Sequence, residues 1–225
     1  LATPKINLCT LEDPIEMIEP AFNQMQVQPA IDLTFANGVR ALLRQDPDII
    51  MLGEIRDLET AEVAIQAALT GHLVLSTLHT NDAPSAISRL LELGVAAYLI
   101  KATLLGVMAQ RLVRTLCPEC KTEHPVSPGD WPGFAPAWAS AAPVNACRPK
   151  GCVQCRGTGY SGRIGVYEIM VVSEKLKALI GPDTDLTAIR RLASAQGMLN
   201  LRLAAAHKVA SGATSMEEAL RVTPA

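Results

Sequence analysis

Short apolar runs alternate with helical patterns along the first half of the chain. The runs cover residues 8–11, 48–52 and 73–77, and each is typical of a buried parallel strand. Helices are expected between and after these runs, with Asp32 and Asp82 as two of the N-caps, over residues 32–44, 59–69 and 82–93. This alternation predicts an α/β domain with a mostly parallel sheet and helices on both faces.

Further helices and one strand are expected beyond residue 95. Residues 96–116 fit one long helix, and residues 163–172 fit a strand. Ser215 and Glu218 fit a capping box, in which the two residues close the start of a last short helix. Further helices are predicted over residues 174–180, 186–195 and 199–210.

Polar, titratable residues follow each of the predicted strands in the first half. Glu12 and Asp13 come after the first strand, Glu54 after the second and His79 after the third. The carboxyl ends of parallel strands face the ligand crevice of an open α/β sheet, so these side chains are expected at one edge. A single strand followed by an acid is more often structural, but three in one chain favour a nucleotide-hydrolysing site.

Several motifs stand in the order of one known family. Residues 10–16 (TLEDPIE) resemble the aspartate box, and residues 48–57 (DIIMLGEIRD) resemble the Walker B motif. Residues 70–72 (TGH) and 78–81 (LHTN) resemble the histidine box. The chain is therefore similar to the hexameric ATPases of type II secretion and type IV pilus assembly, and this resemblance implies a RecA-like P-loop NTPase core.

The resemblance also implies roles for individual residues in ATP hydrolysis with Mg²⁺. Glu54 is expected to hold the Mg²⁺ ion through water and to polarise the attacking water, and Glu12 is the alternative general base. Which glutamate takes the proton stays open, because their pKa values depend on burial and neighbouring charge. The other residues that the motifs associate with nucleotide and Mg²⁺ are Asp13, Glu16, His72, His79 and Thr80.

One motif of P-loop enzymes does not occur in the sequence. The pattern G-x-x-x-x-G-K-[ST], whose backbone N–H groups wrap the phosphates, is absent from the 225 residues. In the family this loop lies shortly before the aspartate box, and here Leu1 comes only a few residues before Thr10. We therefore expect a C-terminal fragment of a longer polypeptide, which is inactive as an ATPase by itself. Arg40, Arg44 and Arg56 are left without a catalytic role, since most surface arginines are simply solvated.

Two Cys-x-x-Cys pairs mark a second region of the chain. In each pair the spacing lets a tight turn direct both sulfurs to one point, and four thiolates complete a tetrahedral, structural zinc site. Two disulfides or a redox pair are the alternatives, and Cys147 and His124 are possible substitute ligands. The expected zinc ligands are Cys117, Cys120, Cys152 and Cys155.

These observations predict three regions. Residues 1–115 are expected to form the C-terminal portion of the RecA-like core, and residues 116–160 a tetracysteine zinc module. Residues 161–225 are expected to form a mainly helical subdomain.

Composition narrows the functional classes. Hydrophobic residues make up 49% and charged residues 19%, which is typical of a globular protein and not of a disordered one. The net charge of −2 provides no basic field for nucleic acid. The most apolar long stretch, residues 95–113, is interrupted by Lys101 and Arg111, so no membrane span is predicted. A cytoplasmic location is expected, with attachment to the bacterial inner membrane through partners.

The resemblance implies a motor that couples ATP hydrolysis to assembly of a pilus or pseudopilus. It further implies a homo-hexamer that works with an inner-membrane platform protein and cytoplasmic adaptor proteins. A non-catalytic, zinc-bearing docking module is the main alternative, favoured by the missing P-loop and opposed by the presence of both glutamates and both histidines. A nucleic-acid motor with a zinc ribbon is a weaker alternative, because only 4% of the residues are aromatic.

Overall fold

The computed structural model describes residues 1–126, 131 and 143–223, and contacts between residues divide the chain into two compact units. Unit 1 comprises Leu1–Thr80, Pro84–Leu105 and Val172–Leu186. Unit 2 comprises Asn81–Ala83, Gly106–Val171 and Thr187–Ala225. The chain therefore passes between the units at several points, and the first crossing lies directly after Thr80.

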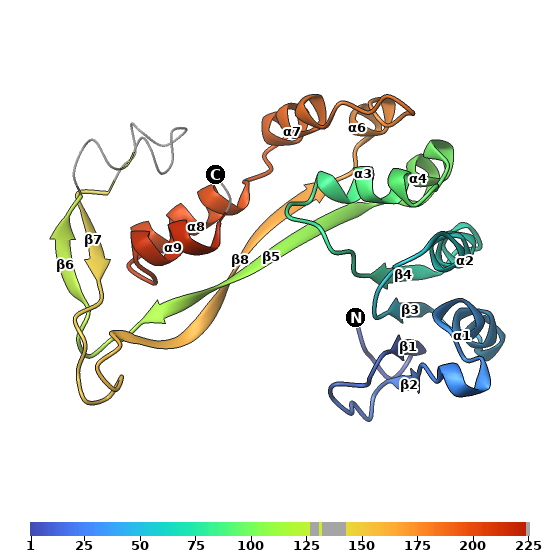
Figure 1. The fold of residues 1–225 in the computed structure, drawn as a ribbon, viewed down its shortest axis with the longest axis horizontal. Coiled ribbons are helices and arrows are strands. Elements are labelled where there is room, and N and C mark those ends of the chain that lie inside the picture. The colour runs from blue at the N-terminus through green and yellow to red at the C-terminus, as the bar shows by residue number, and fades with distance from the viewer. Residues whose placement is uncertain (127–130, 132–142, 224–225) are drawn as a thin grey trace. The chain divides into compact units, whose positions relative to one another are not determined.

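Unit 1 contains a four-stranded sheet in the order β2-β1-β3-β4 (Figure 1), in which every neighbouring pair is parallel. The register places Leu11 opposite Leu52, and Leu52 opposite Ser76. The carboxyl ends of β1, β3 and β4 therefore lie at one edge, which confirms the predicted parallel α/β class. The strands are β1 (Leu8–Glu12), β2 (Asn23–Gln26), β3 (Ile49–Leu52) and β4 (Leu73–Ser76).

Helices α1 (Phe35–Leu42) and α2 (Leu58–Leu69) share an apolar core with the sheet. Alternate residues of β1 and β3 enter this core, because successive side chains of a strand point to opposite faces. Helix α1 approaches β1 so closely that a Cβ atom on Gly38 would lie 2.4 Å from Leu11 Cδ2. The buried core residues from these four elements are Cys9, Leu11, Ala36, Val39, Leu42, Ile50, Leu52, Val63, Ala64 and Ala67.

Two of the predicted helix starts are wrong. Helix α1 is capped by Thr34, whose side chain accepts a hydrogen bond from the Asn37 N–H, whereas Asp32 ends the short 3-10 helix η1 (Pro29–Ile31) in a left-handed conformation. Helix α3 (Ser85–Glu92) begins after Pro84 and has no side-chain cap. Instead of capping α3, the carboxylate of Asp82 accepts hydrogen bonds from Arg190.

Helix α2 begins and ends close to its predicted positions. Asp57 caps α2 by accepting a hydrogen bond from the Thr60 N–H at 2.8 Å, and the chain leaves α2 through Gly71 at φ +106°. A positive φ costs glycine nothing, which explains why the helix ends there. The remaining elements of unit 1 are η2 (Leu43–Gln45), α4 (Ala97–Thr103) and α6 (Glu174–Ala178).

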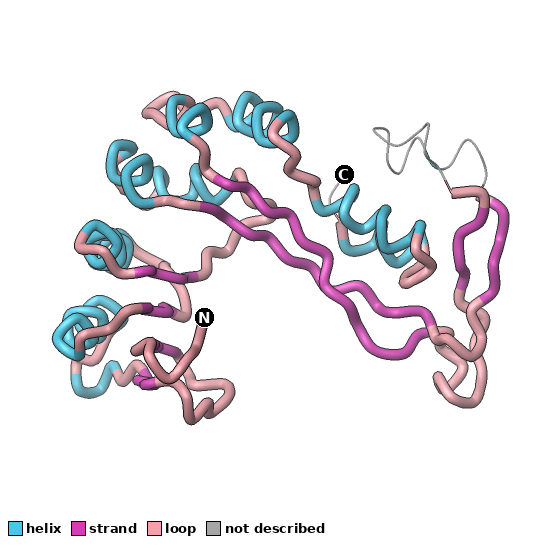
Figure 2. The backbone as a smooth tube through the Cα atoms, turned by 180° about the vertical axis from the view of Figure 1, so that it is seen from behind, coloured by secondary structure: helices cyan, strands magenta, loops and turns pink. Residues whose placement is uncertain are grey.

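Unit 2 contains a long antiparallel ribbon of β5 (Gly106–Leu116) and β8 (Tyr160–Val171), which Figures 1 and 2 show side by side. The predicted helix over residues 96–116 is therefore wrong beyond α4. Residues of β5 have ordinary helix propensity, but pairing with β8, which is distant in sequence, determines their conformation.

Helices pack against one face of this ribbon. Helix α8 (Leu201–Ala210) contacts β8, and α9 (Met216–Val222) contacts β5. Both helices were predicted, but their contacts with the ribbon were not. Helix α7 (Leu186–Ala195) has the predicted bounds, and the short antiparallel strands β6 (Thr122–Pro125) and β7 (Asn145–Arg148) were not predicted. The core of unit 2 contains Val113, Trp131, Ala146, Val166, Ala205, Ala206, Val209 and Ala219.

The start of α9 confirms half of the predicted capping box. The Ser215 side chain accepts a hydrogen bond from the Glu218 N–H at 3.1 Å. The buried Glu218 carboxylate accepts from Arg114 Nη2 and from Arg221 Nη2, each at 2.7 Å, and from the Arg114 N–H at 3.0 Å. Burial alone would raise the pKa of Glu218, but the bonds from both arginines lower it to about 2. Glu218 therefore joins α9 to β5 as a charged group.

Within the described part of the chain, no helix has the combination of length and apolar character that a bilayer crossing needs.

Candidate functional site

Backbone hydrogen bonds join the segments that leave β1, β3 and β4. The Gly53 N–H donates to the Leu11 carbonyl at 2.8 Å, and the Ile55 N–H donates to the Thr77 carbonyl at 3.0 Å. The Thr77 hydroxyl donates to the Gly53 carbonyl at 2.6 Å. These bonds fix the chain on both sides of Glu54, so the sheet edge is a defined platform for this side chain.

The two carboxylate oxygens of Glu54 have different partners. Oε2 lies 3.1 Å from His79 Nε2, and Oε1 accepts a hydrogen bond from Arg56 Nη2. The bond from Arg56 is the largest cause of a lowered pKa of Glu54, and burial opposes it. The Glu54 side chain is 15% exposed and that of His79 88% exposed, so an ionised carboxylate lies beneath an accessible surface. Such a group can bind a cation or orient a water molecule.

Glu12 is the last residue of β1, and neighbouring polar groups orient it. Its Oε1 atom accepts hydrogen bonds from the Thr10 hydroxyl at 2.6 Å and from Gln24 Nε2 at 2.9 Å. Thr10 is fully buried in the sheet, so its hydroxyl is a fixed donor. Glu12 is therefore held at the same sheet edge from which Glu54 leaves β3.

Arg56 connects two of the predicted acidic residues. The pKa of its guanidinium is raised, first by the hydrogen bond to Glu54, then by the charge of Glu54, with a smaller contribution from the charge of Asp13. No catalytic role was predicted for Arg56 from the sequence. The available signal was its position two residues after Glu54 in the same motif.

His72 and Glu16 lie outside these contacts. His72 precedes β4, at the opposite end of the strand from His79, and its Nδ1 atom lies 2.9 Å from the Ala67 carbonyl at the end of α2. Glu16 is exposed in the loop between β1 and β2, and Thr80 is the last residue of its segment of unit 1. The roles of His72, Glu16 and Thr80 at a nucleotide stay predictions.

The two Cys-x-x-Cys pairs form one compact cluster in unit 2. All four sulfurs lie within 4.8 Å of one another, and sulfur pairs are separated by 3.9 Å (Cys117–Cys152), 3.8 Å (Cys120–Cys155) and 3.7 Å (Cys152–Cys155). A tetrahedral ion with metal–sulfur bonds of about 2.3 Å separates its sulfurs by about 3.8 Å. Disulfides require about 2.05 Å, so the spacing fits a metal and not two disulfides.

The predicted substitute ligands lie outside the cysteine cluster. Cys147 is on β7 and His124 is on β6, in a separate two-stranded sheet. Two N–H groups, those of Cys152 and Gly159, each donate to Cys155 Sγ at 3.2 Å. Burial works to raise the pKa of Cys155, but these N–H donors help lower it to about 6, which favours the thiolate that a metal requires.

Glycines allow the loop that carries Cys152 and Cys155, which we call the cysteine loop, to fold this tightly. Gly151 has φ +95°, and a Cβ atom there would lie 2.5 Å from the Gly157 carbonyl oxygen. Gly159 has φ +75°, and a Cβ atom there would lie 2.4 Å from Pro149 Cβ. Side chains at these positions would force the loop apart, so the sulfur positions depend on both glycines.

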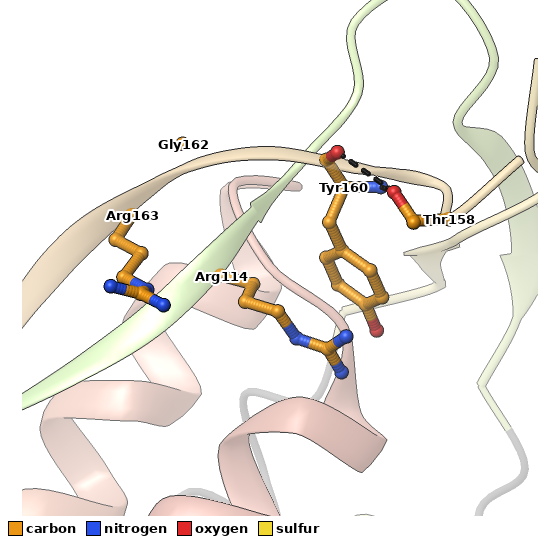
Figure 3. Close-up of a pocket in the computed structure, with 5 residues that line it drawn as sticks. All are labelled: Arg114, Thr158, Tyr160, Gly162 and Arg163. Carbon is orange, nitrogen blue, oxygen red and sulfur yellow. Dashed lines mark hydrogen bonds between the residues drawn. The ribbon is translucent and has the colours of Figure 1, made fainter. Parts of the chain in front are cut away.

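A shallow pocket of about 540 Å³ lies at the end of the ribbon near the cysteine loop (Figure 3). Arg114 and Arg163 are directly opposite each other in the β5–β8 register and line this pocket. The Arg114 guanidinium lies 4.0 Å from the centre of the Tyr160 ring, and the Tyr160 hydroxyl lies 2.7 Å from the Ser215 hydroxyl. The contacts of Arg114 and Tyr160 are thus mainly structural, and none of the predicted site residues lines the pocket.

Comparison with known proteins places this geometry in a family. Residues 1–221 match the family model described as type II/IV secretion system protein. The chain is 58% identical over 224 residues to the type IV pilus assembly ATPase TfpB of Acinetobacter baylyi, covering 100% of this chain and 38% of that protein. It is 48% identical over 217 residues to the type II secretion system protein HxcR of Pseudomonas aeruginosa, covering 96% of this chain and 42% of that protein.

Solved structures agree with this assignment. The pilus retraction motor PilT with bound ADP matches with a TM-score of 0.67 and 26% identity, over 98% of this chain and 53% of PilT. The ATPase DotB of Legionella pneumophila, at 24% identity, matches in fold with a TM-score of 0.68, over 99% of this chain and 52% of DotB. The chain spans less than half the length of the curated relatives described above. The chain belongs to the type II/IV secretion system protein family, as its aspartate, Walker B and histidine boxes predict.

Proposed function

We propose that this chain is part of a motor ATPase that couples ATP hydrolysis to assembly of a pilus or pseudopilus. The single observation that carries the proposal is the ionised Glu54 carboxylate at the end of β3, in contact with His79. Relatives described as type IV pilus assembly ATPases and type II secretion proteins support it. The process is type IV pilus biogenesis or type II protein secretion.

The residues at the sheet edge fit a bound Mg²⁺ ion and ATP phosphates. Glu54 would hold Mg²⁺ through water, with Asp13 and Glu16 as supporting acids, and Mg²⁺ would supply charge neutralisation at the phosphates. Glu54 also orients the attacking water. The bond from Arg56 lowers the pKa of Glu54 and makes it a weaker base, and Glu12, which is held at the same sheet edge, is the alternative group for accepting the proton.

His79 is proposed to report the state of the terminal phosphate. Its ring contacts Glu54 and is otherwise largely exposed, so a change in charge at Glu54 changes its hydrogen bonding directly. His72 and Thr80 are assigned to the same process from the family motif. Hydrolysis further requires a phosphate-binding loop that these 225 residues do not contain, so we propose that they are inactive alone.

The cysteine cluster is proposed to hold a structural Zn²⁺ ion. The sulfur spacing fits tetrahedral coordination, and four cysteines leave no open position for a substrate. The ion would supply folding energy to residues 116–160, which we propose as a zinc module between the ATPase portion (1–115) and the C-terminal subdomain (161–225). Its ligands would be Cys117, Cys120, Cys152 and Cys155.

The motor is proposed to act as a cytoplasmic homo-hexamer. Its partners would be an inner-membrane platform protein and cytoplasmic adaptor proteins, through which it would associate with the bacterial inner membrane. Family membership supports this arrangement.

The test is the ATPase rate of the longer protein that contains this chain, compared with its Glu54→Gln variant. The substitution keeps the size of the side chain but removes its charge, so we expect a rate at least about 100-fold lower. Glu62→Gln, at an exposed position of α2, is the matched control and should keep the wild-type rate. Normal hydrolysis by Glu54→Gln would refute the proposed site, and absence of hydrolysis in the wild type would favour a non-catalytic docking module.

A further inference from the structure

The segment Asn81–Ala83, which begins with the last residue of the histidine box, belongs to unit 2. His79 and Thr80 end a segment of unit 1, whereas Asn81–Ala83 is grouped with the ribbon and the C-terminal helices. The division between the units therefore falls at the Thr80–Asn81 bond, two residues after the histidine that contacts Glu54. Asn81–Ala83 is therefore the part of unit 2 that is nearest in sequence to His79.

Each residue of Asn81–Ala83 is held by a different side chain of unit 2. Arg111 Nη2 on β5 donates to the Asn81 carbonyl at 3.1 Å. Arg190 on α7 donates to Asp82 Oδ2 from Nη2 at 2.8 Å and from Nε at 3.1 Å. Glu168 Oε1 on β8 accepts from the Ala83 N–H at 2.7 Å. We call these three side chains, Arg111, Glu168 and Arg190, the clamp.

Glu168 is the buried member of the clamp. It is 3% exposed, and its second oxygen accepts from the Leu201 N–H at 3.1 Å, at the first residue of α8. Burial raises the pKa of Glu168, and the two backbone N–H donors oppose this rise. A carboxylate in this position offers one oxygen to each donor, and the Leu201 N–H is one of the groups that a helix start leaves without an internal partner.

A purely structural carboxylate would need only to satisfy these N–H groups. Glu168 does more, because the same side chain joins the segment after His79 to the first turn of α8. Arg111 and Arg190 hold the neighbouring residues of that segment from two further elements. The contacts thus connect one short segment to β5, β8, α7 and α8 together.

We propose that the clamp is a positioning device that transmits nucleotide-dependent movement of His79 and Thr80 to the ribbon and C-terminal helices of unit 2. The inference rests on the proposed ATPase function, since it assigns the route by which hydrolysis at Glu54 does mechanical work. Side chains of the clamp do not touch the reacting atoms; they act through Asn81–Ala83.

Amide hydrogen exchange of Leu201–Ala210 in the longer protein tests this, with ADP and with a non-hydrolysable ATP analogue. The wild type should show an exchange difference between the two nucleotides, and Arg190→Ala should reduce that difference at least about fivefold, with the KM for ATP changed less than twofold. Arg190→Lys should restore part of the difference, and Arg191→Ala, at the exposed neighbouring position of α7, should keep it in full. If Arg190 had only a structural role, Arg190→Ala would raise amide exchange equally with both nucleotides.

Glu168→Gln provides an independent variant, and Arg190→Ala, at a half-exposed site, keeps the test usable if Glu168→Gln fails to fold. A full exchange difference in Arg190→Ala, or no difference in the wild type, would overturn the proposal. The ATPase rate of Glu54→Gln is measured in parallel. If this variant still hydrolyses ATP, the proposed function is wrong. If it is inactive and Arg190→Ala keeps the full exchange difference between the two nucleotides, only the clamp proposal is wrong.

Discussion

The lowered pKa of Glu54 comes chiefly from Arg56, a neighbour to which the sequence motif assigns no role. The motif places the glutamate at the end of β3, but its pKa is lowered chiefly by the hydrogen bond from Arg56. His79 and Asp13 complete the local charge pattern, one through the second oxygen of Glu54 and the other through Arg56. The motif thus identifies Glu54, but the lowered pKa of Glu54 depends on contacts that only the fold provides.

We expect Arg56→Gln to raise the pKa of Glu54 towards its ordinary value, because the largest cause of the lowered pKa is removed. A carboxylate with a lowered folded-state pKa stabilises the protein above its unfolded pKa, and this stabilisation is lost as the pH falls through the folded pKa. Arg56→Gln should therefore also weaken the acid dependence of stability. NMR titration of the Glu54 carboxyl carbon measures the shift.

The control for Arg56→Gln is Arg40→Gln, which removes an exposed ion pair with Glu59 and should leave Glu54 unchanged. An unaltered Glu54 pKa in Arg56→Gln would show that Arg56 does not control the charge.

Glu218 is a second residue whose pKa and contribution to stability depend on contacts that the fold provides. Replacing it with Gln should destabilise the protein by about 2–4 kcal/mol, because two arginines and one backbone N–H lose a charged acceptor in a buried position. The pKa of about 2 means that this stabilisation persists above the unfolded pKa and disappears as the pH approaches 2. Urea denaturation at neutral pH measures the loss.

Glu217→Gln, at the adjacent exposed position, should change the stability by less than about 0.5 kcal/mol. Equal effects of Glu217→Gln and Glu218→Gln would contradict the buried network.

Strand β5 marks the limit of prediction at the level of elements. The parallel strands and most helices of unit 1 follow from local apolar patterns and stop signals such as Gly71. Residues 106–116 do not, since their partner strand β8 begins more than forty residues later in the sequence. Asp82 illustrates the same limit, because it looks like a helix cap locally but pairs with Arg190 from a distant helix. The sheet-edge acids and the cysteine cluster were predictable, and the spacing of Arg56 from Glu54 was a signal that the predictions did not use. Glu168 and the clamp arginines were not predictable, because their partners are distant in sequence.

The cysteine cluster permits a prediction for the loop as a unit. Purified protein should contain one zinc ion per chain, and Cys155→Ser should lose it, because three thiolates leave the tetrahedral site incomplete. Cys147→Ser should keep the full zinc content, since Cys147 lies on β7 outside the cluster. Atomic absorption on both variants decides the ligand set, and loss of metal in Cys147→Ser would contradict it. Chelation of the metal should lower the Tm of the wild type.

As a whole, the chain contributes acids, a histidine and a cysteine cluster to the proposed motor, but no phosphate-binding loop. We therefore propose that ATP is bound by a site to which these 225 residues contribute only part. The test compares the chain alone with the longer polypeptide that we propose contains it.

The most direct test is calorimetric titration of both proteins with ATP and Mg²⁺. We predict binding in the micromolar range by the longer protein and none by the 225-residue chain at millimolar ATP. Micromolar binding by the chain alone would contradict the account, because it would require a phosphate site among these residues that neither the motifs nor the sheet edge explains. Absence of binding by the longer protein would contradict it as well, since no motor ATPase could then be built on Glu54.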